Sequence, residues 1–342
     1  MRRIGSIFPT YFTFVMATGI LSVGAERLSH DVLAHVLLGF TLPGYGVVWI
    51  CGLSRLISSP VGLWRDFCGH ASGPVFLSSV AATAVLGSSS IAVGLPIHFA
   101  GILFAAAVVA WVVLIYGFLA MVTEGHEKPS IETGLNGGWL LIVVSTASLS
   151  VLGSDIMRLS GASPALSFVC YVWLALAWLY YALLGSMIFY RFVFVPMPSQ
   201  DITGPWWINA GAAAVTVLAG CQLLAQPGLT IGVFRLHDLI APLIIIFWAD
   251  ATFWIPLLVI LFAWKHFWGA KPFRYSADLW AVVFPMGMYA AATLQFSQTF
   301  TLPFIMPLAQ TLFWAALVLW MASVIGMALH ATGLDPEVAA SR

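Results

Sequence analysis

The sequence predicts an all-α polytopic membrane protein in which ten transmembrane helices cross the bilayer as five successive hairpins. The 342 residues are 61% hydrophobic and only 8% charged, with a mean hydropathy of +0.99. Soluble chains carry about 25% charged residues, and one helical crossing of a bilayer needs about 20 apolar residues. Ten such stretches follow one another along the chain, so we expect one transmembrane domain over residues 1–342.

The apolar stretches give the expected boundaries of the ten helices. In chain order the spans are residues 8–25, 31–57, 74–93, 97–122, 134–153, 164–191, 205–225, 238–267, 277–296 and 303–330.

The basic residues are distributed unequally between the loops on the two sides of these helices. Ten lie at the termini or in loops after even-numbered helices: Arg2, Arg3, Arg55, Arg65, Lys128, Arg191, Lys265, Lys271, Arg274 and Arg342. Three lie on the opposite side: Arg27, Arg158 and Arg235. Since Lys and Arg accumulate in cytoplasmic loops, both termini are predicted to face the cytoplasm of a cell membrane, inner or plasma.

The first span also resembles a secretory signal with a cleavage site at Val23-Gly24-Ala25. Pro9, Thr10, Thr13 and Thr18 make it polar for a signal core, and its removal would leave an odd number of helices. We therefore retain it as the first transmembrane helix.

Odd and even helices differ in composition. The even helices are rich in Leu, Val, Ile, Phe and Trp, whereas the middles of the odd helices are small and weakly polar. In the seventh helix Asn209, Ala213, Thr216 and Gly220 follow helical spacing and make one small-residue face. Such a face favours close helix packing, but it also suits the wall of a substrate path. Its repetition on alternate helices predicts an inner ring of five odd helices that form a pore, surrounded by five even helices.

The residues that carry chemistry are few. Asp250, near the middle of the eighth span, is a candidate for proton coupling, because an ionisable group inside a membrane is costly and often functional. A hydrogen-bonded carboxyl without a transport role is the alternative. The four cysteines form no CxxC pair, the histidines have no HExxH spacing, and no nucleotide-binding glycine loop is present. The sequence therefore predicts no metal, no cofactor, no nucleic-acid partner and no catalytic residues.

Five segments together resemble one family of membrane proteins. They are FVMATGIL (Phe14–Leu21), NGGWLLIVVSTASLSVLG (Asn136–Gly153), WINAGAAAVTVLAG (Trp207–Gly220), FWADATFWIPLLVIL (Phe247–Leu261) and WAVVFPMGMYAAAT (Trp280–Thr293). They are similar to the tellurite-resistance/C4-dicarboxylate transporter family, which includes malate permeases, sulfite efflux pumps and plant slow anion channels. The resemblance covers nearly the whole chain in order.

The resemblance implies a homotrimer in which each protomer has its own pore for small anions, such as malate and other C4-dicarboxylates, sulfite or tellurite. It also implies that Phe284, directly before Pro285, restricts the pore as a gate. A packed aromatic residue is the alternative for Phe284. The family gives no role to Asp250.

These observations together predict an anion channel or transporter. The residues expected to line or shape its path are Gly19, Asn136, Ser145, Asn209, Ala213, Thr216 and Gly287. Two other classes stay open: a polytopic membrane enzyme that acts on a lipid-embedded substrate, and a membrane scaffold or sensor with a closed core.

Overall fold

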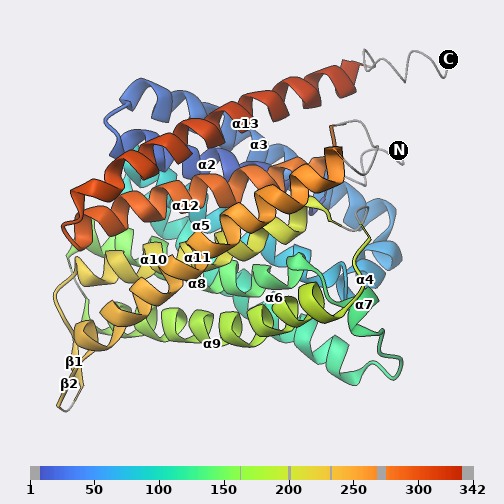
Figure 1. Cartoon of the computed structure of the whole chain (residues 1–342), viewed down its shortest axis with the longest axis horizontal. Coiled ribbons are helices and arrows are strands. Elements are labelled where there is room, and N and C mark those ends of the chain that lie inside the picture. The colour runs from blue at the N-terminus through green and yellow to red at the C-terminus, as the bar shows by residue number, and fades with distance from the viewer. Residues whose placement is uncertain (1–7, 162, 199–201, 232, 268–274, 333–342) are drawn as a thin grey trace.

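The computed structural model describes residues 8–161, 163–198, 202–231, 233–267 and 275–332, and this part of the chain is almost entirely helical. The predicted basic residues Arg2, Arg3, Lys271, Arg274 and Arg342 lie outside the described residues. Ten long helices make up most of this part of the chain, which Figure 1 shows with its longest axis horizontal.

The long helices form two sets that alternate along the chain. The inner set, named for its burial, comprises α2 (Phe12–Arg27), α5 (Ser78–Ala92), α8 (Leu141–Ser160), α10 (Ile208–Leu224) and α12 (Trp280–Thr299). The outer set comprises α3 (Asp31–Ser58), α6 (Ile97–Glu124), α9 (Pro164–Phe194), α11 (Leu236–Phe267) and α13 (Met306–Thr332).

Burial separates the two sets sharply. In the most apolar 18-residue stretch of each segment that contains α5, α8, α10 or α12, 89–94% of the residues are buried. In the same stretch of each outer helix, 28–33% of the residues are buried. The inner helices contact one another in the order α2, α5, α8, α10, α12 and back to α2. Each outer helix packs on the inner helix that precedes it in the chain (Figure 1).

The number of helices able to span a bilayer differs from the ten predicted. Nine helices of the described residues are long and apolar enough, and α2, with 16 residues, is too short to count among them. The expected span began at residue 8, but residues 8–11 form turns instead of helix. At about 1.5 Å per residue, 16 helical residues rise only about 24 Å.

Most of the inner helices are preceded by a short 3₁₀ turn. The turns are η1 (Gly73–Leu77), η2 (Gly137–Leu140), η4 (Gly204–Trp207) and η5 (Ala277–Leu279), and a further one, η6 (Pro303–Ile305), precedes α13. The first four contact one another in chain order. An added Cβ at Gly137 would lie 2.0 Å from the carbonyl oxygen of Pro205, and one at Gly204 would lie 2.0 Å from that of Asp278. Only glycine fits at these two approaches between backbones.

Side chains of the outer helices hydrogen-bond to the inner helix that comes next in the sequence, and α13 bonds back to α2. The pairs are Tyr45–Thr83 (2.8 Å), Trp111–Thr146 (2.9 Å), Tyr181–Asn209 carbonyl (3.5 Å), Trp248–Thr293 (3.2 Å) and Trp320–Thr18 (2.9 Å). Every outer helix thus contributes an aromatic side chain with a polar tip to the inner layer, which satisfies polar groups that lipid could not satisfy.

Two further features differ from the sequence prediction. The helix expected over 134–153 is shifted: η2 occupies 137–140 and α8 continues to Ser160, so Asp155 lies within a helix. The short helices α4 (Pro60–Cys68) and α7 (Ile131–Gly134) and the hairpin of β1 (Thr230–Ile231) and β2 (Phe234–Arg235) were not predicted.

Candidate functional site

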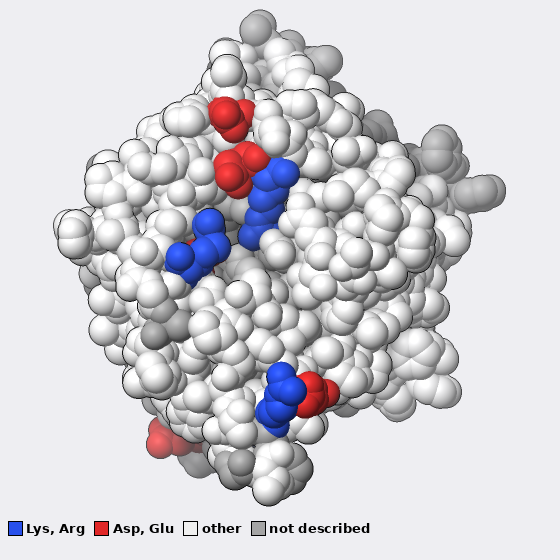
Figure 2. Space-filling view, turned by 90° about the vertical axis from the view of Figure 1, so that its left-hand side faces the viewer, with Lys and Arg blue, Asp and Glu red and all other residues white. Residues whose placement is uncertain are grey.

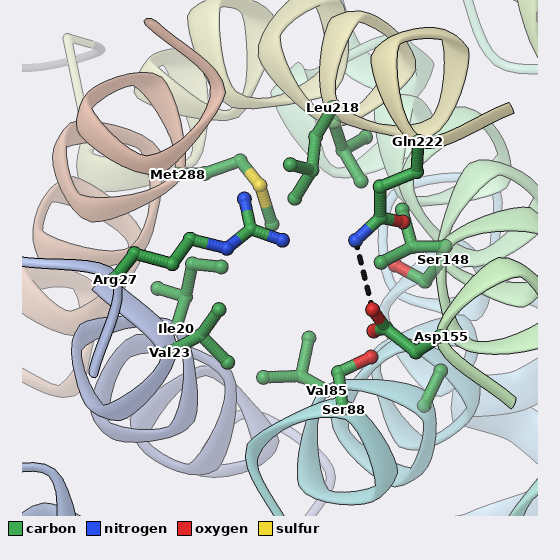
Figure 3. Close-up of a pocket in the computed structure, with 13 residues that line it drawn as sticks. Ile20, Val23, Arg27, Val85, Ser88, Ser148, Asp155, Leu218, Gln222 and Met288 are labelled. Carbon is green, nitrogen blue, oxygen red and sulfur yellow. Dashed lines mark hydrogen bonds between the residues drawn. The ribbon is translucent and has the colours of Figure 1, made fainter. Parts of the chain in front are cut away.

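All five inner helices contribute to one narrow cavity on their common axis, drawn in Figure 3. Its volume is about 10 Å³, which is room for about one water molecule. The lining residues are Ile20, Val23, Arg27, Ala84, Val85, Ser88, Ser148, Val151, Asp155, Val215, Leu218, Gln222 and Met288. The cavity lies toward the C-terminal ends of α2, α5, α8 and α10.

The polar side chains of this cavity are only partly satisfied. The Gln222 amide nitrogen donates to an Asp155 carboxylate oxygen at 3.0 Å. Four other buried polar atoms have no hydrogen-bond partner: Nη1 of Arg27, the hydroxyls of Ser88 and Ser148, and Oε1 of Gln222. Buried polar groups are normally paired, so this cluster can accept a polar or charged ligand.

Arg27 and Asp155 approach the cavity from different walls, as Figure 3 shows. Two ion pairs within 4.0 Å occur among the described residues, Arg55–Asp66 and Arg235–Asp238, and neither involves Arg27 or Asp155. Figure 2 views the molecule from the left of Figure 1, and basic side chains flank a hollow near the centre of this face. The cavity therefore combines a guanidinium that makes no direct ion pair within the described part of the chain with a carboxylate held by an amide.

The direction of Phe284 follows from its neighbours on α12. Gly287 packs on α2, where an added Cβ would meet Ile20 at 3.1 Å, and Pro285 packs against Gly211 of α10. Met288 lies between these directions and lines the cavity. Phe284 is one turn earlier and about 40° from Met288 around the helix, in the same sector. Its side chain is 1% exposed.

Three of the residues expected to shape the path make packing or capping contacts. An added Cβ at Gly19 would meet Val85 at 2.7 Å, and the Gly287 approach to Ile20 is similarly close, so both glycines let neighbouring inner helices approach. Asn136 caps η2: its side chain accepts from the Gly138 N–H and donates to the Ala71 carbonyl.

The small-residue face of α10 points away from the cavity. Asn209, Ala213 and Thr216 lie about 140–180° around the helix from Leu218, which lines the cavity. Gly220 on the same face packs on α11, where an added Cβ would lie 2.6 Å from Ile244. Gly220 therefore makes a helix-packing contact, and Asn209, Ala213 and Thr216 do not line this cavity. Both side-chain polar atoms of Asn209 are buried without a partner.

Ser145 is fully buried one turn before Ser148, and its hydroxyl donates to the Ile142 carbonyl of its own helix at 3.1 Å. It does not line the described cavity.

Asp250 lies on the outer helix α11, away from the axis. It accepts a hydrogen bond from the Tyr181 hydroxyl of α9, and both residues line a groove of about 430 Å³ between α9 and α11. Because the same hydroxyl lies 3.5 Å from the Asn209 carbonyl, Tyr181 connects Asp250 to the inner helix α10.

Sequence reasoning missed Arg27, Asp155, Gln222 and Ser88 as site residues. Arg27 and Asp155 each fall two residues beyond the expected end of a span, at 25 and 153, and so were assigned to loops or left out. The available signal was the Arg27–Asp155 charge pair at the ends of two odd helices. Among the described residues, no group of three or more His, Cys, Asp or Glu could hold a metal ion.

Comparisons with known proteins agree with this architecture. A family described as voltage-dependent anion channel matches residues 6–328. Two uncharacterized transporters of Methanocaldococcus jannaschii are 25% and 24% identical over 336 and 330 residues, covering 94% and 92% of this chain and 92% of each relative. An uncharacterized membrane protein of Mycobacterium tuberculosis is 33% identical over 150 residues, 44% of this chain and 76% of that protein.

Proposed function

Because the chain belongs to the voltage-dependent anion channel family, we propose that it moves small anions across a cell membrane along the axis of its five inner helices. The expected substrates are C4-dicarboxylates such as malate, or related oxyanions such as sulfite and tellurite. We further propose a homotrimer with a path in each protomer and with both termini in the cytoplasm.

The observation that carries this proposal is the cavity that all five inner helices share. Its walls come from five separated segments of the chain, and four buried polar atoms of its lining residues have no hydrogen-bond partner. Inside a membrane, unsatisfied polar groups are tolerated where they line a path for water or solute. A closed structural core would gain from replacing these groups by apolar ones, which argues against the scaffold alternative.

Phe284 is proposed as the gate of this path. Its position one turn from Met288, in the sector between the α2 and α10 contacts of α12, supports a ring that points into the axis. Pro285 cannot donate a backbone hydrogen bond within α12, which leaves a carbonyl free in the preceding turn. Both features favour an aromatic constriction deeper than the polar cavity.

Asp250 is proposed as a proton-coupling group that acts through Tyr181. A hydroxyl has one proton to donate, so a charged Asp250 and the Asn209 carbonyl compete for that of Tyr181. When Asp250 is protonated, its own O–H can donate to Tyr181, and the Tyr181 proton becomes available to α10. Protonation on the outer layer would thereby change a contact of the inner layer.

Flux measurements on purified protein in liposomes test the gate. We expect Phe284→Ala to raise anion uptake in a counterflow panel of malate, succinate, sulfite, nitrate and chloride, because truncation to Ala opens the constriction. The matched control is Phe296→Ala, which removes a ring of the same helix that is also buried but stacks on Trp248 of α11, with centroids 4.8 Å apart.

Both substitutions should lower stability, since truncating a buried Phe costs about 3–5 kcal/mol in soluble cores. Only Phe284→Ala should raise flux. Unchanged or lost flux in folded Phe284→Ala protein contradicts the gate, and a wild-type liposome that passes none of the five anions contradicts the proposed function.

A further inference from the structure

The strongest unassigned feature is the polar cluster at the C-terminal end of the inner helices. Arg27 ends α2, Ser88 lies on α5, Asp155 on α8 and Gln222 on α10. We propose that Arg27 is the anion-coordinating residue of the path, that the hydroxyls of Ser88 and Ser148 assist it, and that Asp155 limits how tightly the anion is held. This inference rests on the proposed function and names a binding site within it.

Two donors of this cluster, Arg27 and Ser148, line the cavity and have buried atoms without a hydrogen-bond partner. A guanidinium offers five N–H donors, and Nη1 of Arg27 is buried with no hydrogen-bond partner. The hydroxyl of Ser148 is also unpartnered, and that of Ser88 lies beside the Asp155 carboxylate without a hydrogen bond of standard geometry. These side chains are only 2% and 6% exposed. A cation with neutral donors around one small space is the arrangement that binds a single anionic group, such as a halide, nitrate or one carboxylate.

Asp155, on a different wall of the cavity from Arg27, limits how tightly the site holds an anion. Asp155 is 6% exposed and is held by the Gln222 amide at 3.0 Å. A structural ion pair would join Asp155 to Arg27 directly, yet no contact within 4.0 Å does so. A carboxylate beside the cavity repels an anion that Arg27 attracts. A permeating ion must leave the site as well as enter it. The repulsion by Asp155 lowers the affinity for the anion and so allows its release.

Three charged side chains act electrostatically on Arg27: Asp155 most strongly, then Glu26 and then Arg158. Arg158 also acts on Asp155. Arg158 is exposed and does not line the cavity. It therefore provides a basic residue on the same face of the protein that lacks the proposed role.

Anion binding can be measured without transport. The unfolding temperature of the purified full-length protein in detergent is followed as chloride, nitrate or malate is raised, with ionic strength held constant by a bulky organic sulfonate. A ligand that binds the folded state stabilises it in proportion to ln(1 + [L]/Kd), so each titration gives a half-saturating concentration. Uptake into liposomes is measured in parallel.

The expected shifts have opposite signs. Arg27→Gln should raise the half-saturating concentration at least about tenfold, the usual effect of losing a hydrogen bond to a charged group. Arg27→Lys should retain part of the affinity, because it keeps the charge and loses the fork of donors. Asp155→Asn should lower the half-saturating concentration, since it removes the repulsion and keeps an acceptor for Gln222. Arg158→Gln should shift the half-saturating concentration far less than Arg27→Gln, because Arg158 is exposed and does not line the cavity.

Three outcomes would overturn the site: wild-type affinity in Arg27→Gln, an equal effect of Arg158→Gln, or a shift of Arg27→Gln and Asp155→Asn in the same direction, which indicates a purely structural pair. A misfolded variant cannot mimic the tighter binding expected of Asp155→Asn. Arg27-dependent binding together with impermeable wild-type liposomes would support the site and contradict the proposed transport function.

Discussion

The inner and outer helices solve opposite problems in the same chain. The inner helices have 15–20 residues. The most apolar 18-residue stretches of the segments that contain α5, α8, α10 and α12 have mean hydropathies of 1.3–1.8, and α2 is too short to contain such a stretch. The outer helices have 27–32 residues and stretches of 1.8–2.6. The most apolar helices are therefore the least buried.

This inversion reflects the solvent. Lipid is as apolar as leucine, so burial of apolar surface does not drive membrane helices together, and small residues and hydrogen bonds do. The inner helices approach one another closely at glycines such as Gly19, Gly87 and Gly211, and the outer helices cover them with aromatic side chains whose polar tips reach inward. The same substitution should consequently change stability differently in an inner helix and in an outer helix.

Glycine substitutions should give the largest difference. Gly204→Ala places a Cβ 2.0 Å from the Asp278 carbonyl oxygen, so η4 and η5 must separate. Overpacking costs about 1–3 kcal/mol and more where backbone blocks relaxation. We expect little monodisperse protein in size-exclusion chromatography and a lowered unfolding temperature.

Gly39→Ala is the matched substitution on the outer helix α3, where an added Cβ meets nothing within 4 Å. It should leave yield and unfolding temperature as they are or raise them slightly, because Ala is the better helix former. Equal damage from the two substitutions would mean that the close approach of the 3₁₀ turns does not hold the inner layer together.

The sequence predicted helix positions best where a long stretch of apolar residues was enough to identify a helix. Apolar length placed the outer helices well: α3 begins at Asp31 and α6 at Ile97, as predicted. Inner helices were placed less well, because their polar residues resemble loops. Residues 154–160 of α8 include Ser154, Asp155 and Arg158, and only the fold shows that they continue a helix.

The candidate site was harder to predict for a related reason. A face of small residues on α10 fits a pore wall and a packing surface equally well, and the structure shows a packing contact with α11 at Gly220. Spacing along one helix shows which residues share a face, but not which neighbouring helix or cavity that face contacts. Arg27, Ser88, Asp155 and Gln222 come from four helices, so only the closed cycle of contacts brings them together.

Hydrogen bonds between the two layers should give a moderate effect. Thr146→Val removes the acceptor of the Trp111 indole N–H, which is 2.9 Å away. Such bonds in membrane proteins average about 0.6 kcal/mol and reach about 1.7 kcal/mol. We expect a small fall in unfolding temperature, and a double-mutant cycle with Trp111→Phe should recover this coupling energy.

Thr311→Val is the control on the outer helix α13, where the exposed hydroxyl bonds only to the Pro307 carbonyl of its own helix. It should have no measurable effect on stability. Additive losses in the Trp111–Thr146 cycle, or a Thr311→Val effect of the same size, would show that the inward-pointing aromatic tips do not bind the two layers.

The smallest effect on passive conduction is expected for Asp250→Asn, which tests whether the outer layer can influence the inner one. Asp250 faces the groove between α9 and α11, so passive anion flux should be unchanged. An amide keeps a partner for Tyr181 but cannot gain or lose the proton, so any pH dependence of uptake should disappear.

Asp238→Asn, the same substitution at an exposed position of α11 that pairs with Arg235, should alter neither property. Uptake measured across pH in liposomes separates the alternatives. Preserved pH dependence in Asp250→Asn would leave Asp250 as a helix-packing carboxyl, whereas loss of passive flux would mean that the outer layer belongs to the path itself.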